Sequence, residues 1–136
     1  MGLLADRRIL ITGVLSTRSI AYGVAKACQR EGATLAFTYA NEDIKDRVVR
    51  IAAEFGPCPV LPCDVASDDE IAALFDRLRA EWGALDGILH SIAFAPREAL
   101  SGDFLDGLSR AAFTVAHDVS SYSFAALAKG ARPLLK

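Results

Sequence analysis

The residues with the clearest chemical potential lie in a glycine turn between an apolar strand and an amphipathic helix. The strand is expected over residues 8–12, the turn begins at Gly13, and the helix starts near Ser19. Free backbone N–H groups and the positive end of the helix dipole meet at such a turn, so it can bind a phosphate without a dedicated cation. The turn also opens a βαβ unit, and this combination points to a nucleotide cofactor.

The spelling of this turn departs from the usual dinucleotide fingerprint, G-x-G-x-x-G. After Gly13 the next glycine is Gly23, and Ser19 and Ala21 stand between them. Gly13 would give the turn an unrestricted backbone, Ser19 would cap the helix or meet a phosphate, and Ala21 would allow close packing. The alternative is an ordinary strand-to-helix turn capped by a serine.

The elements that must position this turn follow from the apolar periodicity, which alternates strands and helices along the chain. Gly32, Gly56 and Gly83 mark helix ends, Asn41 is a predicted N-cap, and residues 67–70 spell a capping box. The expected strands are 8–12, 34–39, 59–63 and 85–91, and the expected helices are about 19–30, 42–55, 68–82 and 109–135. The alternation predicts an α/β fold with a doubly wound parallel sheet and helices on both faces.

In such a sheet a ligand lies beyond the carboxyl ends of the strands, where the strand order reverses. The segments that follow the four strands should therefore form one contiguous cleft. Asp64 could accept a hydrogen bond from an adenine amino group, Val65 could pack on the ring, and Ile92 could offer apolar surface near the ribose. The alternative for Asp64 is a turn or cap residue.

Composition narrows the function classes further. The chain has 136 residues, 52% of them hydrophobic, and a net charge of −2 with acidic and basic residues interspersed. This length suits one domain with a real core, and the charge pattern argues against nucleic acid as a partner. No apolar run approaches the ~20 residues that span a bilayer, and the first residues lack a signal-peptide or myristoylation pattern. We therefore expect a cytoplasmic protein without a membrane partner.

The cysteines and histidines do not form a recognisable metal or disulfide pattern. Cys28, Cys58 and Cys63 contain no Cys-x-x-Cys pair, and His90 and His117 lie in different expected elements. Buried or partly buried thiols are expected, and no metal site is predicted. No serine or cysteine can be paired with a histidine base from the sequence, so the sequence does not support a hydrolase.

Six sequence blocks together resemble the NADH-dependent bacterial enoyl-acyl-carrier-protein reductases, a divergent branch of the short-chain dehydrogenases/reductases. The resemblance runs from Gly2 to the last residue. Ordinary members of the superfamily would carry Gly-x3-Gly-x-Gly after the first strand and Asn-Asn-Ala-Gly after the fourth, and this chain does not. The blocks are Thr12-Gly13-Val14, Ser19-Ile20-Ala21-Tyr22-Gly23, Phe37-Thr38-Tyr39, Cys63-Asp64-Val65, His90-Ser91-Ile92-Ala93-Phe94-Ala95-Pro96 and Ala116-His117-Asp118-Val119-Ser120-Ser121-Tyr122-Ser123.

The resemblance implies a cofactor, NADH/NAD, and a role for each matching residue. Gly13, Ser19 and Ile20 would contact the pyrophosphate and nearby ribose, Asp64 and Val65 the adenine, and Ser91, Ile92 and Ala93 the ribose and nicotinamide, while Ala95 would lie at the acyl-substrate pocket. Two positions depart from the family, since relatives place glutamine at Ala40 and often glycine at Ala93. NADPH therefore stays an alternative cofactor, although no arginine directly follows the second strand to pair a 2′-phosphate.

The resemblance also implies a reaction of fatty acid biosynthesis. Hydride would pass from the nicotinamide to the double bond of a trans-2-enoyl thioester carried on acyl carrier protein. In the family the catalytic tyrosine and lysine lie beyond the position of Lys136, so no catalytic residue is assigned here. Residues 1–136 are then expected to be the dinucleotide-binding N-terminal part of a larger single-domain enzyme, inactive alone. The open edge of the strand at 85–91, where we see no protecting device, favours the same expectation.

Two alternatives stand beside this expectation. The chain could be a nucleotide-binding fragment or an association module without catalysis. Tyr122 and Lys129 also have the family's catalytic Tyr-x6-Lys spacing, but they lie in the helix that precedes the catalytic one, so we interpret the spacing as a coincidence.

Small residues form a narrow stripe along the last expected helix. Such a stripe either packs against the domain's own sheet or lets another helix approach closely. The resemblance favours pairing with a symmetry mate and a homotetramer for the complete protein. The stripe is Ala112, Ala116, Val119, Ser123, Ala126 and Gly130.

Overall fold

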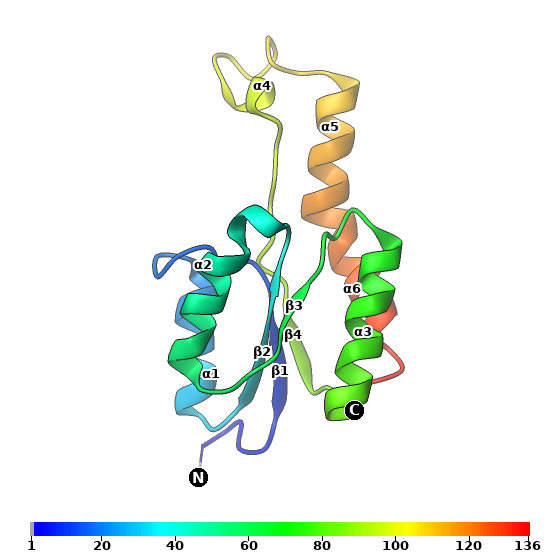
Figure 1. The fold of residues 1–136 in the computed structure, drawn as a ribbon. Coiled ribbons are helices and arrows are strands. Elements are labelled where there is room, and N and C mark those ends of the chain that lie inside the picture. The colour runs from blue at the N-terminus through cyan, green and yellow to red at the C-terminus, as the bar shows by residue number, and fades with distance from the viewer. Residues whose placement is uncertain (1) are drawn as a thin grey trace.

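The computed structural model describes residues 2–136 and contains one four-stranded parallel sheet (Figure 1). Its strands lie in the order β3-β2-β1-β4, so the strand order reverses between β1 and β4. Ile9 in β1 is opposite Leu35 in β2 and Gly87 in β4. The strands are β1 (Arg8–Ile11), β2 (Thr34–Tyr39), β3 (Val60–Pro62) and β4 (Gly87–Leu89). The predicted doubly wound α/β fold is confirmed.

Helices cover both faces of this sheet (Figure 1). On one face lie α1 (Ile20–Arg30) and α2 (Glu42–Ala52), which a short 3-10 helix, η1 (Ala53–Phe55), extends. On the other face lie α3 (Asp68–Trp82) and α6 (Ser123–Ala131). Each face has its own apolar core.

The two cores follow from the alternation of side chains along β1. Ile11 points into the cluster beneath α1 and α2, with Phe37 and Val48, whereas Leu10 points into the cluster beneath α3 and α6, with Leu74. Successive strand residues face opposite sides of a sheet, so a strand buried on both faces is apolar throughout. This explains the unbroken apolar run of β1.

β2 has the predicted bounds, and the other three strands are shorter than predicted, so the residues at their ends become connecting segments. Thr12 lies just beyond β1, although its amide still donates to the carbonyl of Leu89, and β4 covers only the centre of the predicted strand at 85–91. Two predicted caps are present, since Asn41 accepts a hydrogen bond from the Ile44 amide and Ser67 from the Glu70 amide. Only one of the two bonds of the capping box is formed, because the Glu70 carboxylate accepts from the amide of Asp64 and not from the amide of Ser67.

The predicted helix over 109–135 is broken into three pieces. It begins as α5 (Arg110–His117), which Ser109 caps, continues as a π-helical segment, η2 (Asp118–Tyr122), and ends as α6. Pro133, which lacks an amide hydrogen, follows the end of α6. Before α5 the chain passes through α4 (Arg97–Leu100), and both elements project beyond the carboxyl edge of the sheet (Figure 1).

Much of the stripe of small residues packs against the domain itself, and its expected role in pairing with a symmetry mate stays a prediction. Ala112, Ser123 and Ala126 are buried, and Val119 packs on the core beneath α3. A Cβ on Gly130 would come within 2.7 Å of the Phe75 ring. Small side chains are needed here because α3 passes close to α6.

The outer edge of β4 is less open than the sequence suggested. Leu85 forms a parallel bridge with Leu135, and its amide donates to the carbonyl of Leu134 at 2.9 Å. The chain returns to this edge after α6, a long-range contact that local periodicity does not reveal. The expectation that nothing protects this edge is therefore wrong at Leu85, the first residue of the predicted strand.

The three cysteines are free thiols, as predicted, with Cys28 and Cys63 buried and Cys58 partly buried. None of the helices in residues 2–136 is long and apolar enough to cross a membrane.

Candidate functional site

The first part of the site is the close approach of two strand ends at the point where the strand order reverses. Gly13 has a φ of +78°, a left-handed conformation that favours glycine. A Cβ at this position would also collide with the backbone carbonyl of Ser91. Gly13 and Ser91, predicted to share one site, are thus brought together. The absence of a side chain at Gly13 leaves the backbone of the turn open to the phosphates of a ligand.

Thr12 fixes this approach and was not singled out by the sequence analysis. Its buried hydroxyl donates to the carbonyl of Leu89 at 2.7 Å and accepts from the amide of Ser91 at 3.1 Å. One side chain therefore joins the end of β1 to the segment after β4. The only signal in the sequence was a threonine directly before the turn glycine.

Ser19 stands at the N-cap position of α1 but does not cap the helix with its side chain. Its hydroxyl accepts instead from the amides of Leu15 at 2.9 Å and Ser16 at 3.1 Å, which shapes the turn. The expected capping role is corrected, because the loop amides compete for the same oxygen. Within residues 2–136 the amides of Ile20 and Ala21 consequently have no protein acceptor.

These two amides fit the pyrophosphate of a dinucleotide. Amides of the first helical turn point along the axis toward the positive end of the helix dipole, where an anion is favoured. The side chain of Ile20 is 80% exposed, so it does not close the helix end. The glycine turn and the unpaired helix amides together make the site chemically suited to the phosphates of NADH.

The segment after β3 places Asp64 at the surface and Val65 in the core. One carboxylate oxygen of Asp64 accepts from the amide of Ala66 at 2.9 Å, so this side chain takes the alternative role of a turn residue. The side chain of Val65 is buried in the cluster beneath α3. The contacts of both residues with adenine stay predictions, and the buried side chain of Val65 leaves little surface for a ring.

Cys63, beside Asp64, is not available as a nucleophile. Burial, together with the nearby Glu70 and Asp64 carboxylates, raises the pKa of its thiol to about 12. A thiol is nucleophilic as the thiolate, so Cys63 is inert at neutral pH.

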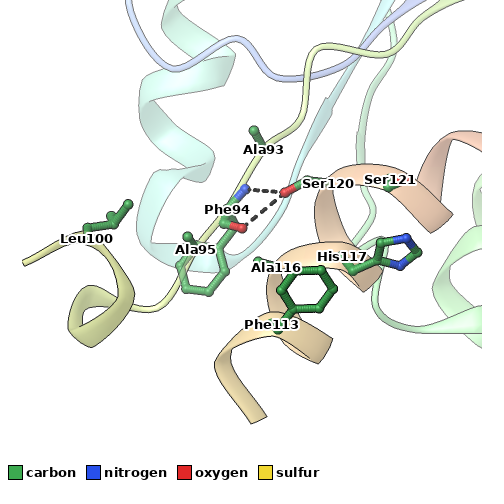
Figure 2. Close-up of a pocket in the computed structure, with 9 residues that line it drawn as sticks. All are labelled: Ala93, Phe94, Ala95, Leu100, Phe113, Ala116, His117, Ser120 and Ser121. Atoms are coloured by element: carbon green, nitrogen blue, oxygen red, sulfur yellow. Dashed lines mark hydrogen bonds between the residues drawn. The ribbon is translucent and has the colours of Figure 1, made fainter. Parts of the chain in front are cut away.

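The segment after β4 is pinned to the π-helical segment at two points. The amide of Phe94 donates to the Ser120 hydroxyl at 2.9 Å, and that hydroxyl donates to the carbonyl of Phe94 at 3.0 Å (Figure 2). At the other point, Nε2 of His90 lies 2.8 Å from the hydroxyl oxygen of Ser123. Because Ser123 donates its hydrogen to the carbonyl of Val119 at 2.6 Å, Nε2 of His90 must carry the donated proton.

A pocket of about 510 Å³ lies between this segment and α5. Ala93, Ala95 and Leu100 line one side of it, and Phe113 and Ala116 line the other (Figure 2). Its walls are mainly apolar side chains, which suits a hydrocarbon chain. The structure therefore places Ala93 and Ala95, two of the predicted contacts, in one pocket.

Tyr122 and Lys129 do not line this pocket. Tyr122 is 52% exposed and lines a separate depression of about 390 Å³ beside α5, and Lys129 is exposed on α6. No three metal-ligating side chains gather anywhere in residues 2–136.

A doubly wound parallel sheet, with a glycine turn and unpaired helix amides at its switch point, is typical of the Rossmann-fold proteins that bind dinucleotides. The sequence profile described as Enoyl-(Acyl carrier protein) reductase matches residues 13–136. The chain belongs to this enoyl-acyl-carrier-protein reductase family.

Individual relatives agree with the family assignment. The enoyl-(acyl-carrier-protein) reductase (NADH) FabI of Neisseria meningitidis serogroup B is 57% identical over 136 residues, which is 100% of this chain and 52% of the relative. The solved enoyl-(acyl-carrier-protein) reductase (NADH) of Aquifex aeolicus superposes with a TM-score of 0.94 at 49% identity, covering 98% of this chain and 58% of that one.

A third relative is the reductase of Anaplasma phagocytophilum in complex with NAD. It superposes with a TM-score of 0.91 at 36% identity, covering 98% of this chain and 51% of that chain. This chain thus spans about half the length of the relatives that it matches.

Proposed function

We propose that this chain is the cofactor-binding part of an enoyl-acyl-carrier-protein reductase of fatty acid biosynthesis. The observation that carries the proposal is the switch point, where Gly13 lies against Ser91 and the first amides of α1 lack protein acceptors. The bound cofactor would be NADH, which supplies the hydride for the double bond of a trans-2-enoyl thioester. Residues 1–136 would then be the dinucleotide-binding N-terminal part of a larger single domain.

The proposal assigns each contact to a group near the carboxyl edge of the sheet. Ile20 and its neighbour Ala21 would offer backbone amides to the pyrophosphate, while Gly13 gives the phosphates room to approach. Ser19 would act mainly by shaping the turn, since its hydroxyl already accepts two amides. Asp64 has one carboxylate oxygen in a turn, which leaves the other for the adenine amino group.

The nicotinamide and the acyl chain would share the segment after β4. Ser91, Ile92 and Ala93 would line the ribose and nicotinamide, and Ala95 the acyl pocket. The apolar pocket at Ala93 and Ala95 supports this arrangement, because a hydrocarbon chain gains free energy where apolar surface is removed from water. NADPH stays the alternative cofactor, and no arginine directly follows Tyr39 to pair its 2′-phosphate.

The proposed substrate partner is acyl carrier protein, and we expect a cytoplasmic homotetramer for the complete enzyme, without nucleic acid or membrane partners. Contacts between copies would use the partly exposed members of the small-residue stripe together with exposed apolar side chains of the same region. Val115 on α5 and Phe124 on α6 are two such side chains.

The experiment is an assay of the purified native protein that carries this chain. Loss of NADH absorbance is followed with a trans-2-enoyl thioester and, separately, with a saturated thioester of the same length. We expect oxidation of NADH only with the unsaturated substrate. Binding of NADH without turnover would favour a nucleotide-binding fragment. Neither binding nor turnover would contradict the proposed function and favour an association module.

A further inference from the structure

The segment between β4 and α4 has no regular secondary structure, so side chains must hold its backbone in place. Within residues 2–136, the hydrogen bonds that anchor residues 91–95 to other elements come from two hydroxyl groups. Thr12 accepts from the amide of Ser91, and Ser120 makes the other two bonds, both to Phe94. Ser120 is thus the main anchor of this segment on the side facing α5.

Ser120 contacts both polar groups of the Phe94 backbone. Its hydroxyl accepts from the Phe94 amide and donates to the Phe94 carbonyl, so the amide has no hydrogen left to donate to a ligand. Two bonds to one residue also fix its orientation, because rotation about either bond breaks the other. Ser120 itself then acts on the segment and not on a bound molecule.

The π-helical segment supplies the geometry for this contact. The amide of Ser123 reaches back to the carbonyl of Asp118, and the buried Ser123 hydroxyl satisfies the carbonyl of Val119 while accepting from His90. Ser123 and Ser120 therefore hold the two ends of the same short stretch, at His90 and at Phe94. Single π turns inside α-helices are frequent at functional sites.

Phe94 lies between the two residues with the most direct proposed roles. Ala93 precedes it on the nicotinamide side, Ala95 follows it at the acyl pocket, and all three line the pocket in Figure 2. We propose that Ser120 is a positioning residue, whose hydroxyl holds the Phe94 backbone and thereby sets Ala93 against the cofactor and Ala95 against the substrate. This inference rests on the proposed function.

The test compares three variants of the native protein. Ser120→Ala removes the hydroxyl, and Ser120→Thr retains it. Thr114→Ala is the matched control, because among residues 2–136 the Thr114 hydroxyl bonds only to the carbonyl of Arg110 in its own helix. The measurements are amide hydrogen exchange of peptides covering residues 90–97, and KM and kcat for NADH and for the enoyl thioester.

For Ser120→Ala we expect exchange of the Phe94 amide to rise at least about tenfold, and KM for NADH and for the thioester to rise about tenfold, with a smaller change in kcat. Ser120→Thr should restore both KM values to within about twofold, and Thr114→Ala should match the wild type. A merely structural role would lower the melting temperature and leave the KM values of the folded enzyme unchanged.

Three results would overturn the inference. Unchanged hydrogen exchange at Phe94 in Ser120→Ala would show that Ser120 does not anchor this segment. Faster exchange with unchanged KM values would show that the anchor does not position the segment for binding, while the proposed function would stand. An equal rise of KM in Thr114→Ala would show that any lost helix hydroxyl has this effect. If the wild type neither binds nor oxidises NADH, the proposed function fails and the positioning role fails with it.

Discussion

Gly13 meets two independent requirements at one position, a left-handed backbone and contact with the carbonyl of Ser91. A non-glycine residue costs about 1–2 kcal/mol in the left-handed region, and here its Cβ also collides with backbone. Gly13→Ala should therefore push the turn away from Ser91 and lower both stability and cofactor affinity. We expect a melting temperature several degrees lower and a Kd for NADH raised by more than about tenfold.

Gly23→Ala is the matched control for this prediction. Gly23 lies within α1 and has open space around the position of a Cβ. Alanine is favoured over glycine in a helix by about 0.5–1 kcal/mol, so this variant should melt at a higher temperature and bind NADH as before. Equal NADH affinity in the two variants would contradict the role of Gly13.

Which site residues could be predicted depends on how local their signals are. Gly13 and the helix start near Ser19 follow from the order strand, glycine turn, helix. Thr12 and Ser120 could not be found in the same way, because their partners, Ser91 and Phe94, become neighbours only in the folded chain. The hydrogen bonds of Ser19 could not be predicted either, because loop amides and helix amides compete for its hydroxyl oxygen.

At the scale of elements, Asp86 joins the start of β1 to the turn before β4. Its carboxylate accepts from the amide of Arg8 at 2.9 Å and from the Arg7 guanidinium at 3.1 Å. The backbone hydrogen bond from Arg8, and then Arg7, lowers the pKa of Asp86. A lowered pKa in the folded state adds stability above the unfolded pKa of about 3.9, and this stability is lost as the pH falls through the folded value.

Asp86→Asn should therefore be less stable than the wild type at neutral pH and lose less stability on acidification. The measurement is the urea midpoint between about pH 6 and pH 3. Asp106→Asn, which changes an exposed carboxyl in the segment between α4 and α5, should follow the wild-type curve. Parallel curves for Asp86→Asn and the wild type would contradict the proposed contribution of this carboxylate.

The contact between α3 and α6 gives a second prediction at this scale. A Cβ at Gly130 would meet the buried Phe75 ring at 2.7 Å and Ile71 at 3.1 Å. Overpacking of this kind costs roughly 1–3 kcal/mol, more than the gain in helix propensity. Gly130→Ala should thus lower the melting temperature, unlike Gly23→Ala. A raised melting temperature would contradict this close packing of α6 on α3.

Element existence and type followed well from the sequence, and the interruptions did not. Caps such as Asn41 and Ser67 are local and were predicted with their helices. The π segment was missed because the apolar spacing around it is that of an ordinary helix. It is held by the long-range bond between His90 and Ser123, which no local pattern shows.

At the scale of the whole molecule, alternating apolar strands and amphipathic helices were enough to predict the parallel sheet. The order β3-β2-β1-β4 then places the switch point between Gly13 and Ser91. The direction of the small-residue stripe could not be predicted, since packing on α3 and packing on a second copy require the same small side chains. The pairing of Leu85 with Leu135 likewise depends on where the chain returns after α6.

The most direct test of the central claim is a titration of the purified protein with NADH, followed by cofactor fluorescence, on the wild type and Gly13→Ala. The account predicts saturable binding by the wild type and a Kd more than about tenfold higher for the variant. Absence of NADH and NADPH binding by folded wild-type protein would contradict it.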